Sequence, residues 1–162
     1  MSKAVVLLSG GLDSTTTLAI AKSQSFDCYA LSFDSGQKQY SELVSAKSIA
    51  NEFGVIEHRI MKISLADIGG SALTDVNLKV PKYKESNEIP IEGERLIIHT
   101  PLIDQTKSQI IKKGLSLGVD YSQTISCYQA NNKGEACGEC DACVLRQNGF
   151  NQAGVIDHTK YQ

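Results

Sequence analysis

The stretch AVVLLSGGLDSTT, residues 4–16, decides the fold of the N-terminal half of the chain. Its first five residues form an apolar run of strand length, and the residues from Ser14 onward begin a helical pattern with a hydroxyl at the N-cap position. Two glycines, Gly10 and Gly11, stand between these patterns. The stretch therefore predicts a buried strand, a tight glycine turn and a helix, in that order.

This turn has the features of a phosphate-binding loop. Gly10 and Gly11 allow positive φ angles and close approach of the backbone, and the first turn of the following helix offers unpaired N–H donors. The hydroxyls of Ser9, Ser14 and Thr15 add further donors. The loop is not a Walker A motif, because no lysine follows the glycines, and it is not a dinucleotide-binding fingerprint. An ordinary glycine turn with a capping serine is the alternative, but the order of strand, loop and helix favours phosphate binding.

Strand and helix patterns continue to alternate after this loop. Residues 27–33 form a strand pattern, residues 41–53 place apolar side chains on one face of a helix, and residues 55–63 form a third strand pattern. This β-α-β-α-β series predicts the α/β class, with a doubly wound parallel sheet, right-handed crossovers and helices on both faces. Ligands of such sheets bind at the carboxyl ends of the strands, where SGGLDS and FDSGQ fall.

The regular pattern is lost between residues 75 and 95, which are polar and show neither helical nor strand periodicity. Residues 96–103 again predict a strand, residues 106–118 predict a helix, and the part from Val119 onward is rich in cysteine and irregular. We therefore expect a nucleotide-binding α/β domain over residues 1–118. A C-terminal element, residues 119–162, is expected to pack on the same domain.

Composition excludes several classes of function. With 162 residues, of which 41% are hydrophobic, the chain can bury one core. A net charge of -2 gives no electrostatic basis for binding nucleic acid or a membrane surface, so neither is expected as a partner. The apolar run at the start is too short for a signal peptide or a membrane span, which predicts a cytoplasmic protein. In a reducing compartment its cysteines are expected to bind metal or react rather than form disulfides.

Four of the five cysteines, Cys127, Cys137, Cys140 and Cys143, have the spacing C-x9-C-x2-C-x2-C. Four thiolates at such spacing can converge on a tetrahedral zinc ion at Zn–S distances of about 2.3 Å. An iron–sulfur cluster and a set of redox-active thiols are the alternatives. The closed set of four cysteines favours a structural zinc knuckle with no open position for catalysis. Cys28 is expected to be a small buried core residue.

The segment SGGLDS, residues 9–14, resembles the SGGxDS signature of the PP-loop ATP pyrophosphatase superfamily, whose fold is of the adenine nucleotide alpha hydrolase type. The resemblance implies that ATP binds on this loop with its pyrophosphate in the turn, and that the substrate is activated by transfer of AMP. Asp13 repels phosphate, so its implied role is to accept Mg²⁺ or backbone N–H groups that shape the loop.

Four stretches together resemble a narrower family. LSGGLDSTT, LSFDSGQ, IHTPLIDQTKSQII and SCY…CGECDACVLRQNGF are similar to segments of the 7-cyano-7-deazaguanine synthases, ATP-dependent carbon–nitrogen ligases of queuosine precursor biosynthesis. The resemblance implies that ATP activates the carboxylate of 7-carboxy-7-deazaguanine and that ammonia displaces the leaving group to give an amide. A second ATP then activates the amide oxygen for dehydration to the nitrile. The resemblance also suggests a homodimer.

The same resemblance implies the functional residues. Asp13, Ser14 and Lys107 are the expected catalytic residues, and the four C-terminal cysteines are the expected zinc ligands. Lys107 could supply the phosphates with the cation that the loop lacks, and a solvated surface lysine is the alternative. The ATP site is expected to comprise Leu8, Ser9, Gly10, Gly11, Leu12, Asp13, Ser14, Thr15, Thr16, Thr17 and Leu18.

Members of this family are longer than the present chain. Between the equivalents of Pro90 and Ile91 they carry a substrate-binding segment with PGRN-type or PARN-type and GYPDCR-type motifs, and neither motif occurs here. We therefore expect a family segment to be missing at this point. Two other functions stay open. One is a PP-loop enzyme that adenylates transfer RNA for sulfur or nitrogen insertion, which the near-neutral charge disfavours. The other is a zinc-knuckle interaction module with a vestigial ATP loop.

Overall fold

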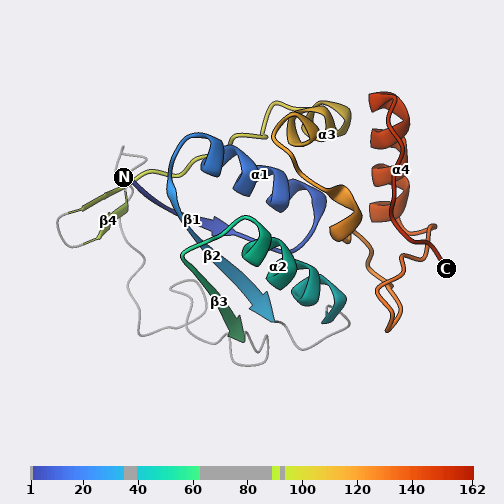
Figure 1. Cartoon of the computed structure of the whole chain (residues 1–162), viewed down its shortest axis with the longest axis horizontal. Coiled ribbons are helices and arrows are strands. Elements are labelled where there is room, and N and C mark those ends of the chain that lie inside the picture. Colours follow the sequence, from blue (N-terminus) through green and yellow to red (C-terminus); the bar gives the residue numbers. More distant parts are fainter. Residues whose placement is uncertain (1, 35–39, 63–88, 92–93) are drawn as a thin grey trace, which may run out of the picture.

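The computed structural model describes residues 2–34, 40–62, 89–91 and 94–162. Its main sheet has three parallel strands, in the order β1 (Lys3–Leu7), β2 (Asp27–Asp34) and β3 (Glu57–Lys62). In the sequence, α1 (Leu12–Ser23) lies between β1 and β2, and α2 (Tyr40–Glu52) lies between β2 and β3 (Figure 1). The predicted α/β class and the parallel sheet are confirmed.

Helices α1 and α2 cover the same face of this sheet. Val6 of β1 and Ala30 of β2 pack in one buried core with Leu18 of α1 and with Ala46 and Ile49 of α2. Two right-handed crossovers that add strands to a sheet in one direction place both helices on one face. The predicted helices on both faces are therefore not seen among the described residues.

The opposite face of the sheet carries exposed apolar side chains. Val5 is 68% exposed, Leu7 62%, Phe33 42% and Met61 52%. These positions alternate with the covered ones along paired strands, so the four side chains share the face that α1 and α2 leave open. Parallel sheets normally have both faces covered, because both are apolar.

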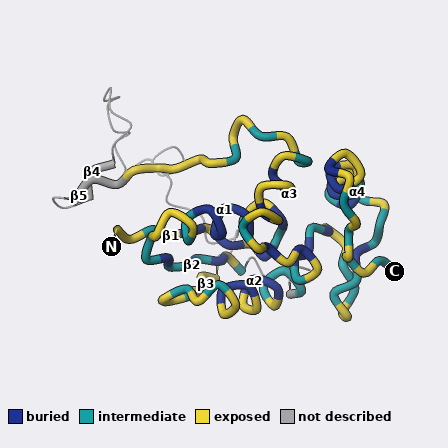
Figure 2. Tube along the Cα trace, turned by 45° about the horizontal axis from the view of Figure 1, so that its top comes forward, coloured by how far each residue is buried: buried dark blue, intermediate teal, exposed yellow. Residues whose placement is uncertain are grey.

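The C-terminal part of the chain packs on α1. α3 (Lys107–Ser116) contacts both α1 and α4 (Asp141–Ala153). A second core joins Leu12, Ile111 and Phe150 of these helices around the buried ring of Tyr121. In Figure 2 the buried residues of α4 lie on the side that faces α3. The N-terminal sheet and the C-terminal helices are thus linked through α1.

Two sequence predictions are wrong in this region. The strand predicted for residues 96–103 is not formed, because only Leu96 lies in a strand, β5 (Glu94–Leu96), which pairs antiparallel with β4 (Ile89–Ile91). Pro101 lies in the turn that follows, and proline has no N–H for a sheet ladder. The part after Val119 is not irregular throughout, because it contains a 3-10 turn (Tyr121–Gln123) and α4.

The remaining region without periodicity, residues 75–95, lies outside the described residues except for β4 and the start of β5. In the described part of the chain, no helix combines the length and the apolar character needed to cross a membrane.

A polar pair lies within the covered face of the sheet. The buried Ser32 hydroxyl on β2 donates to the carbonyl oxygen of Leu8, so its oxygen is left to accept from Nε2 of His58 on β3 at 2.7 Å. This pattern places a proton on Nε2. Burial, together with the charge of Lys47, lowers the pKa of His58 and favours the neutral ring.

We expect this histidine to make the fold sensitive to mild acid. Because the pKa of His58 is lower in the folded chain than in the unfolded chain, the unfolded state takes up the proton first as pH falls below about 6.5. Stability is therefore lost on the acid side, and His58→Gln should flatten the pH dependence between about pH 5 and 7. Urea unfolding at several pH values measures this, with the exposed His99→Gln as control. An equal pH slope in His58→Gln and the wild type contradicts the prediction.

Candidate nucleotide and metal sites

Hydroxyl groups shape the loop between β1 and α1. Ser9 N donates to Ser14 Oγ at 3.2 Å, Gly11 N donates to Ser9 Oγ at 3.3 Å, and Ser14 Oγ donates to Gly11 O at 3.0 Å. Gly11 is the N-cap of α1 and has no side chain that could cap the helix. Leu12 N donates to Ser126 Oγ at 3.4 Å, whereas the next two amides of α1, those of Asp13 and Ser14, have no acceptor among the described residues and can face an anion.

Gly10 has a steric reason to be glycine. Its φ angle is +84°, a left-handed conformation that side chains disfavour, and a Cβ atom here would collide with the backbone of α2 at Glu42 and Ala46. The carbonyl oxygen of Gly10 accepts from Ser45 Oγ of α2 at 3.0 Å. The loop therefore rests directly on the first turns of α2.

The predicted ATP-site residues fall into two groups in the structure. Those at the start of the stretch line cavities, whereas Gly10 and residues 15–18 line neither of the two cavities described below. Thr15 and Thr16 are buried and donate to the carbonyl oxygens of Gly11 and Leu12, and Leu18 belongs to the core. These later residues line neither cavity but hold the loop in place through hydrogen bonds and core packing.

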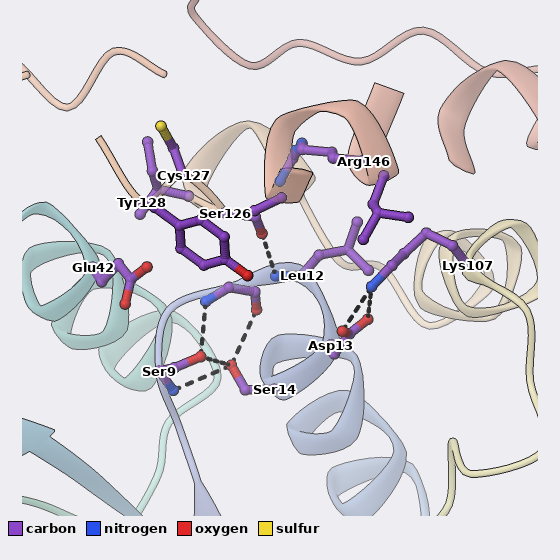
Figure 3. A pocket seen from close by; sticks show the side chains of 14 residues that line it. Ser9, Leu12, Asp13, Ser14, Glu42, Lys107, Ser126, Cys127, Tyr128 and Arg146 are labelled. Atoms are coloured by element: carbon purple, nitrogen blue, oxygen red, sulfur yellow. Dashed lines mark hydrogen bonds and ion pairs between the residues drawn. The ribbon is translucent and has the colours of Figure 1, made fainter. Parts of the chain in front are cut away.

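Lys107 reaches the loop from α3, 94 positions along the chain. Its Nζ lies 2.8 Å from Oδ1 and 2.7 Å from Oδ2 of Asp13. Thr106 and Gln109 form a capping box that begins α3 at Lys107. A Cβ atom on Gly149 of α4 would collide with the stem of Lys107, so α4 packs closely against this side chain. Helix packing thus directs the ammonium group to Asp13 (Figure 3).

Two cavities meet at the phosphate-type loop. The larger, of about 390 Å³, lies between the loop, α3 and α4, and the smaller, of about 350 Å³, lies at the carboxyl ends of β1 and β2. Ser9 and Glu42 line both. The larger cavity is lined by Ser9, Gly11, Leu12, Asp13, Ser14, Glu42, Lys107, Ile125, Ser126, Cys127, Tyr128, Ala142, Leu145 and Arg146. The smaller is lined by Leu7, Leu8, Ser9, Leu31, Ser32, Phe33, Glu42 and Leu43.

Sequence reasoning missed Glu42 and Ser126 as site residues. Glu42 lies in the first turn of α2, and Ser126 Oγ accepts from Leu12 N at 3.4 Å. The only signal for Glu42 is its place just after the carboxyl end of the second strand, where ligands of parallel sheets bind. Ser126 has no such signal except that it precedes Cys127.

The four predicted metal ligands converge. The Sγ atoms of Cys127, Cys137, Cys140 and Cys143 all lie within 4.8 Å of one another, and Cys140 Sγ is 3.5 Å from Cys143 Sγ and 4.0 Å from Cys127 Sγ. All are free thiols. A tetrahedral ion with Zn–S bonds of about 2.3 Å separates its sulfurs by about 3.8 Å. The cluster therefore has the composition and spacing needed to hold a metal ion, and it fits zinc.

Backbone N–H groups donate hydrogen bonds to two of these sulfurs, which favours the thiolate form that binds a cation. Cys137 N donates to Cys127 Sγ at 3.2 Å, and Cys140 N donates to Cys137 Sγ at 3.4 Å. Cys140 is the N-cap of α4. Burial opposes its ionisation, but hydrogen bonds from the backbone and from neighbouring thiols lower the pKa of Cys140 to about 6. Burial raises the pKa of Cys143 and of Cys127.

Arg146 faces the larger cavity but is fully engaged in the protein. Its side chain is 2% exposed, and it forms a two-point ion pair with Asp157 at 2.9 Å and 3.0 Å. It also donates to Thr124 Oγ1 and to the carbonyl oxygen of Tyr121. Arg146 thus holds α4, the segment before Cys127 and the C-terminal residues together.

The comparison with family models identifies the chain. Residues 3–93 and 84–154 match the model described as Queuosine biosynthesis protein QueC. The chain belongs to the QueC family. The two matched parts cover both the phosphate-type loop and the four cysteines, so the two sites of this chain are parts of one QueC protein.

Curated relatives agree with this assignment. The chain is 48% identical over 221 residues to the 7-cyano-7-deazaguanine synthase of Vesicomyosocius okutanii, with 99% of this chain and 96% of the relative covered. Identity to the synthase of Ruthia magnifica is 47%, with 99% and 96% covered. For the synthase of Cellvibrio japonicus it is 43%, with 98% and 97% covered.

This QueC chain lacks an internal segment of its relatives. The alignment to the Vesicomyosocius okutanii protein runs over 221 residues, which exceeds the 162 residues of this chain by 59. The family model matches in two parts whose ends overlap at residues 84–93, so the break falls there. The prediction of a missing segment between Pro90 and Ile91 is supported by both findings.

We expect the cysteine cluster to bind about one metal ion per chain. Cys137→Ser should remove most of the bound metal, because it replaces a thiolate with a hydroxyl. Affinity should also fall in acid, since the thiols must lose protons to bind. Metal analysis of purified protein measures this, with Cys28→Ala as control because Cys28 lies outside the cluster. Full metal content in Cys137→Ser contradicts the assignment.

We also expect the Arg146–Asp157 pair to stabilise the C-terminal part. Asp157→Asn leaves a buried guanidinium without its counter-charge, which should lower the free energy of unfolding by about 3 kcal/mol at neutral pH. Burial raises the pKa of Asp157, but hydrogen bonds and the charge of Arg146 outweigh burial and lower it. The difference should therefore shrink as pH falls below about 4. Urea unfolding measures it, with the exposed Asp104→Asn as control, and equal stability of both variants contradicts it.

Proposed function

We propose that this chain is an ATP-dependent carbon–nitrogen ligase that converts 7-carboxy-7-deazaguanine and ammonia to 7-cyano-7-deazaguanine. The observation that carries the proposal is a phosphate-type loop whose helix has a glycine N-cap without a side-chain cap, in a chain of the QueC family. Its curated relatives carry the name 7-cyano-7-deazaguanine synthase. The reaction belongs to the biosynthesis of the queuosine precursor.

We propose that ATP spans the two cavities. The smaller cavity is lined largely by apolar side chains at the ends of β1 and β2, which suits a planar base. The loop of residues 9–14 supplies amides and hydroxyls to the phosphates. Because Ser9 lines both cavities, a nucleotide with its base in the smaller one can place its phosphates on the loop. The larger cavity is then left for the substrate to be activated.

The reaction requires two activation steps, first of the carboxylate oxygen and then of the amide oxygen. The substrate carboxylate attacks the α-phosphorus of ATP, and the bond to pyrophosphate breaks. Ammonia then attacks the carbonyl carbon, so that a C–N bond forms, AMP leaves and the nitrogen loses a proton. In the second activation the amide oxygen attacks another ATP, and pyrophosphate leaves. Loss of AMP, together with both N–H protons of the amide, gives the nitrile. Mg²⁺, when bound with ATP, neutralises phosphate charge.

Three side chains are assigned catalytic roles in this proposal. Lys107 provides the ammonium group that stabilises charge on the leaving pyrophosphate. Asp13 positions Lys107, because both of its carboxylate oxygens accept from Nζ. Because both oxygens of Asp13 are occupied by Lys107, we favour a role in positioning Lys107 over the alternative role as a magnesium ligand. Ser14 holds the loop through Ser9 and Gly11 and offers its hydroxyl to a phosphate oxygen.

The other expectations complete the proposal. Cys127, Cys137, Cys140 and Cys143 hold a structural zinc ion, which has no open position for substrate. The protein works in the cytoplasm, without nucleic acid or membrane as a partner, and as a homodimer. The exposed apolar face of β1–β3 supports a doubly wound arrangement in which a further layer covers this face. Residues 8–18 form the ATP site, either as its lining or as its support.

We expect the full chain, incubated with 7-carboxy-7-deazaguanine, ammonium, ATP and Mg²⁺, to form AMP, pyrophosphate and the nitrile. Lys107→Ala should lower the rate on the order of 100-fold, because it removes a charge aimed at the phosphates. Mass spectrometry of the products measures the reaction. Lys112→Ala is the matched control, since Lys112 is exposed on the same helix.

The products separate the possible outcomes. If the folded wild-type chain forms no AMP, no amide and no nitrile, the proposed ligase activity is contradicted and an interaction module is favoured. Formation of AMP and pyrophosphate without amide indicates that the nucleotide chemistry is retained but that the nitrogen step is not. A rate in Lys107→Ala equal to that of Lys112→Ala contradicts the role of Lys107.

A further inference from the structure

Glu42, like Ser9, lines both cavities. It lies in the first turn of α2, beside the loop. We call the smaller cavity the base cavity, because the base of ATP is proposed to bind there. Figure 3 shows its carboxylate on the side of the cavity opposite the Asp13–Lys107 pair. A nucleotide that runs from the base cavity to the loop must therefore pass Glu42.

The carboxylate of Glu42 has no partner in the described part of the chain, and no hydrogen bond or ion pair engages it there. The residue is half-buried, and this burial raises the pKa of its carboxyl group. A carboxylate that is partly removed from water without a cation or a donor is unfavourable in its charged form. Among the residues that the structure describes, this negative charge therefore lacks compensation.

The other charged groups of the larger cavity are compensated. Asp13 is paired with Lys107, and Arg146 is paired with Asp157. Glu42 is thus the one unpaired charge among the described residues that line the cavities, and it has the same sign as a nucleotide's phosphates. Two like charges about 4 Å apart repel by several kcal/mol at a protein surface. A site for ATP can tolerate this carboxylate only if a cation enters with the nucleotide.

We propose that Glu42 supplies a carboxylate oxygen to a divalent cation carried by the phosphates, so that the site selects magnesium–nucleotide over free nucleotide. This inference rests on the proposed function. Magnesium in nucleotide sites is typically held by one or two carboxylates together with phosphate oxygens and water. A single carboxylate at the edge of the loop meets that need. The ion satisfies Glu42 and screens it from the phosphates.

Asp13 is less suited to this role than Glu42. Both of its oxygens accept from Lys107 Nζ, at 2.8 Å and 2.7 Å, so a cation at Asp13 would displace Lys107 and lie beside a second positive charge. Glu42 can offer its oxygens without breaking a hydrogen bond or ion pair with any described residue. The two sides of the phosphate site then carry different cations, the ammonium of Lys107 on one side and the divalent ion on the other.

The test compares binding of ATP in EDTA and in MgCl₂ by isothermal titration of the full chain. In the wild type, Mg²⁺ should strengthen binding at least about tenfold. Glu42→Gln removes the charge and keeps the shape, so it should bind free ATP about tenfold more tightly and lose the gain from Mg²⁺. Glu52→Gln, at the exposed end of the same helix, is the control and should behave as the wild type.

Two further measurements keep the test decisive. Glu42→Asp retains the charge and should still bind free ATP weakly, and thermal unfolding shows whether each variant is folded. A wild-type gain from Mg²⁺ in folded Glu42→Gln overturns the inference alone. An equal loss of affinity in EDTA and in MgCl₂ also overturns it, because the carboxylate then contacts the nucleotide itself. Absence of ATP binding by the folded wild type overturns the proposed function together with this inference.

Discussion

The rest of the structure depends on one junction, at the backbone of Gly10. Its carbonyl oxygen accepts from Ser45 Oγ at 3.0 Å and from the amide of Ile125 at 3.1 Å. These bonds join three segments that are far apart in the sequence: the phosphate-type loop, α2 and the segment that leads to the cysteines. Any side chain at Gly10 would collide with α2. Because Gly10 places no side chain between the three segments, the cavities at the loop have walls from all of them.

This junction lets the loop use charges that its own sequence lacks. Lys107 comes from α3, and Glu42 comes from α2, on opposite sides of the loop (Figure 3). Lys107 reaches Asp13 because α4 approaches α3 closely at Gly149. A Walker A motif places its lysine within the loop, whereas here the cation depends on tertiary packing. The proposed binding of phosphate at this site therefore depends on the packing of α3 on α4 and on α1.

Much of the fold and part of the site could be predicted from local pattern. The strand, loop and helix of residues 4–16 are specified by neighbours in sequence, and so is the cysteine spacing that predicts the metal cluster. The side of the sheet on which α2 packs could not be predicted, because periodicity does not encode strand order. From the sequence, a helix over residues 144–150 is only one of two interpretations, because polar residues and cysteines interrupt the apolar pattern of α4. The position of Glu42 beside the loop depends on the contact between Gly10 and α2, and the sequence indicates only that Glu42 follows the carboxyl end of the second strand.

The cysteine cluster and the phosphate-type loop share one short segment, and this gives the proposed structural metal a functional consequence. Ile125 bonds to Gly10, Ser126 accepts from Leu12 at 3.4 Å, and Cys127 is one of the four cluster residues. A cation that holds Cys127 removes conformational freedom from the two residues before it. Those residues line the larger cavity. A metal bound by the cluster can thus order the wall of the proposed nucleotide site without touching the nucleotide.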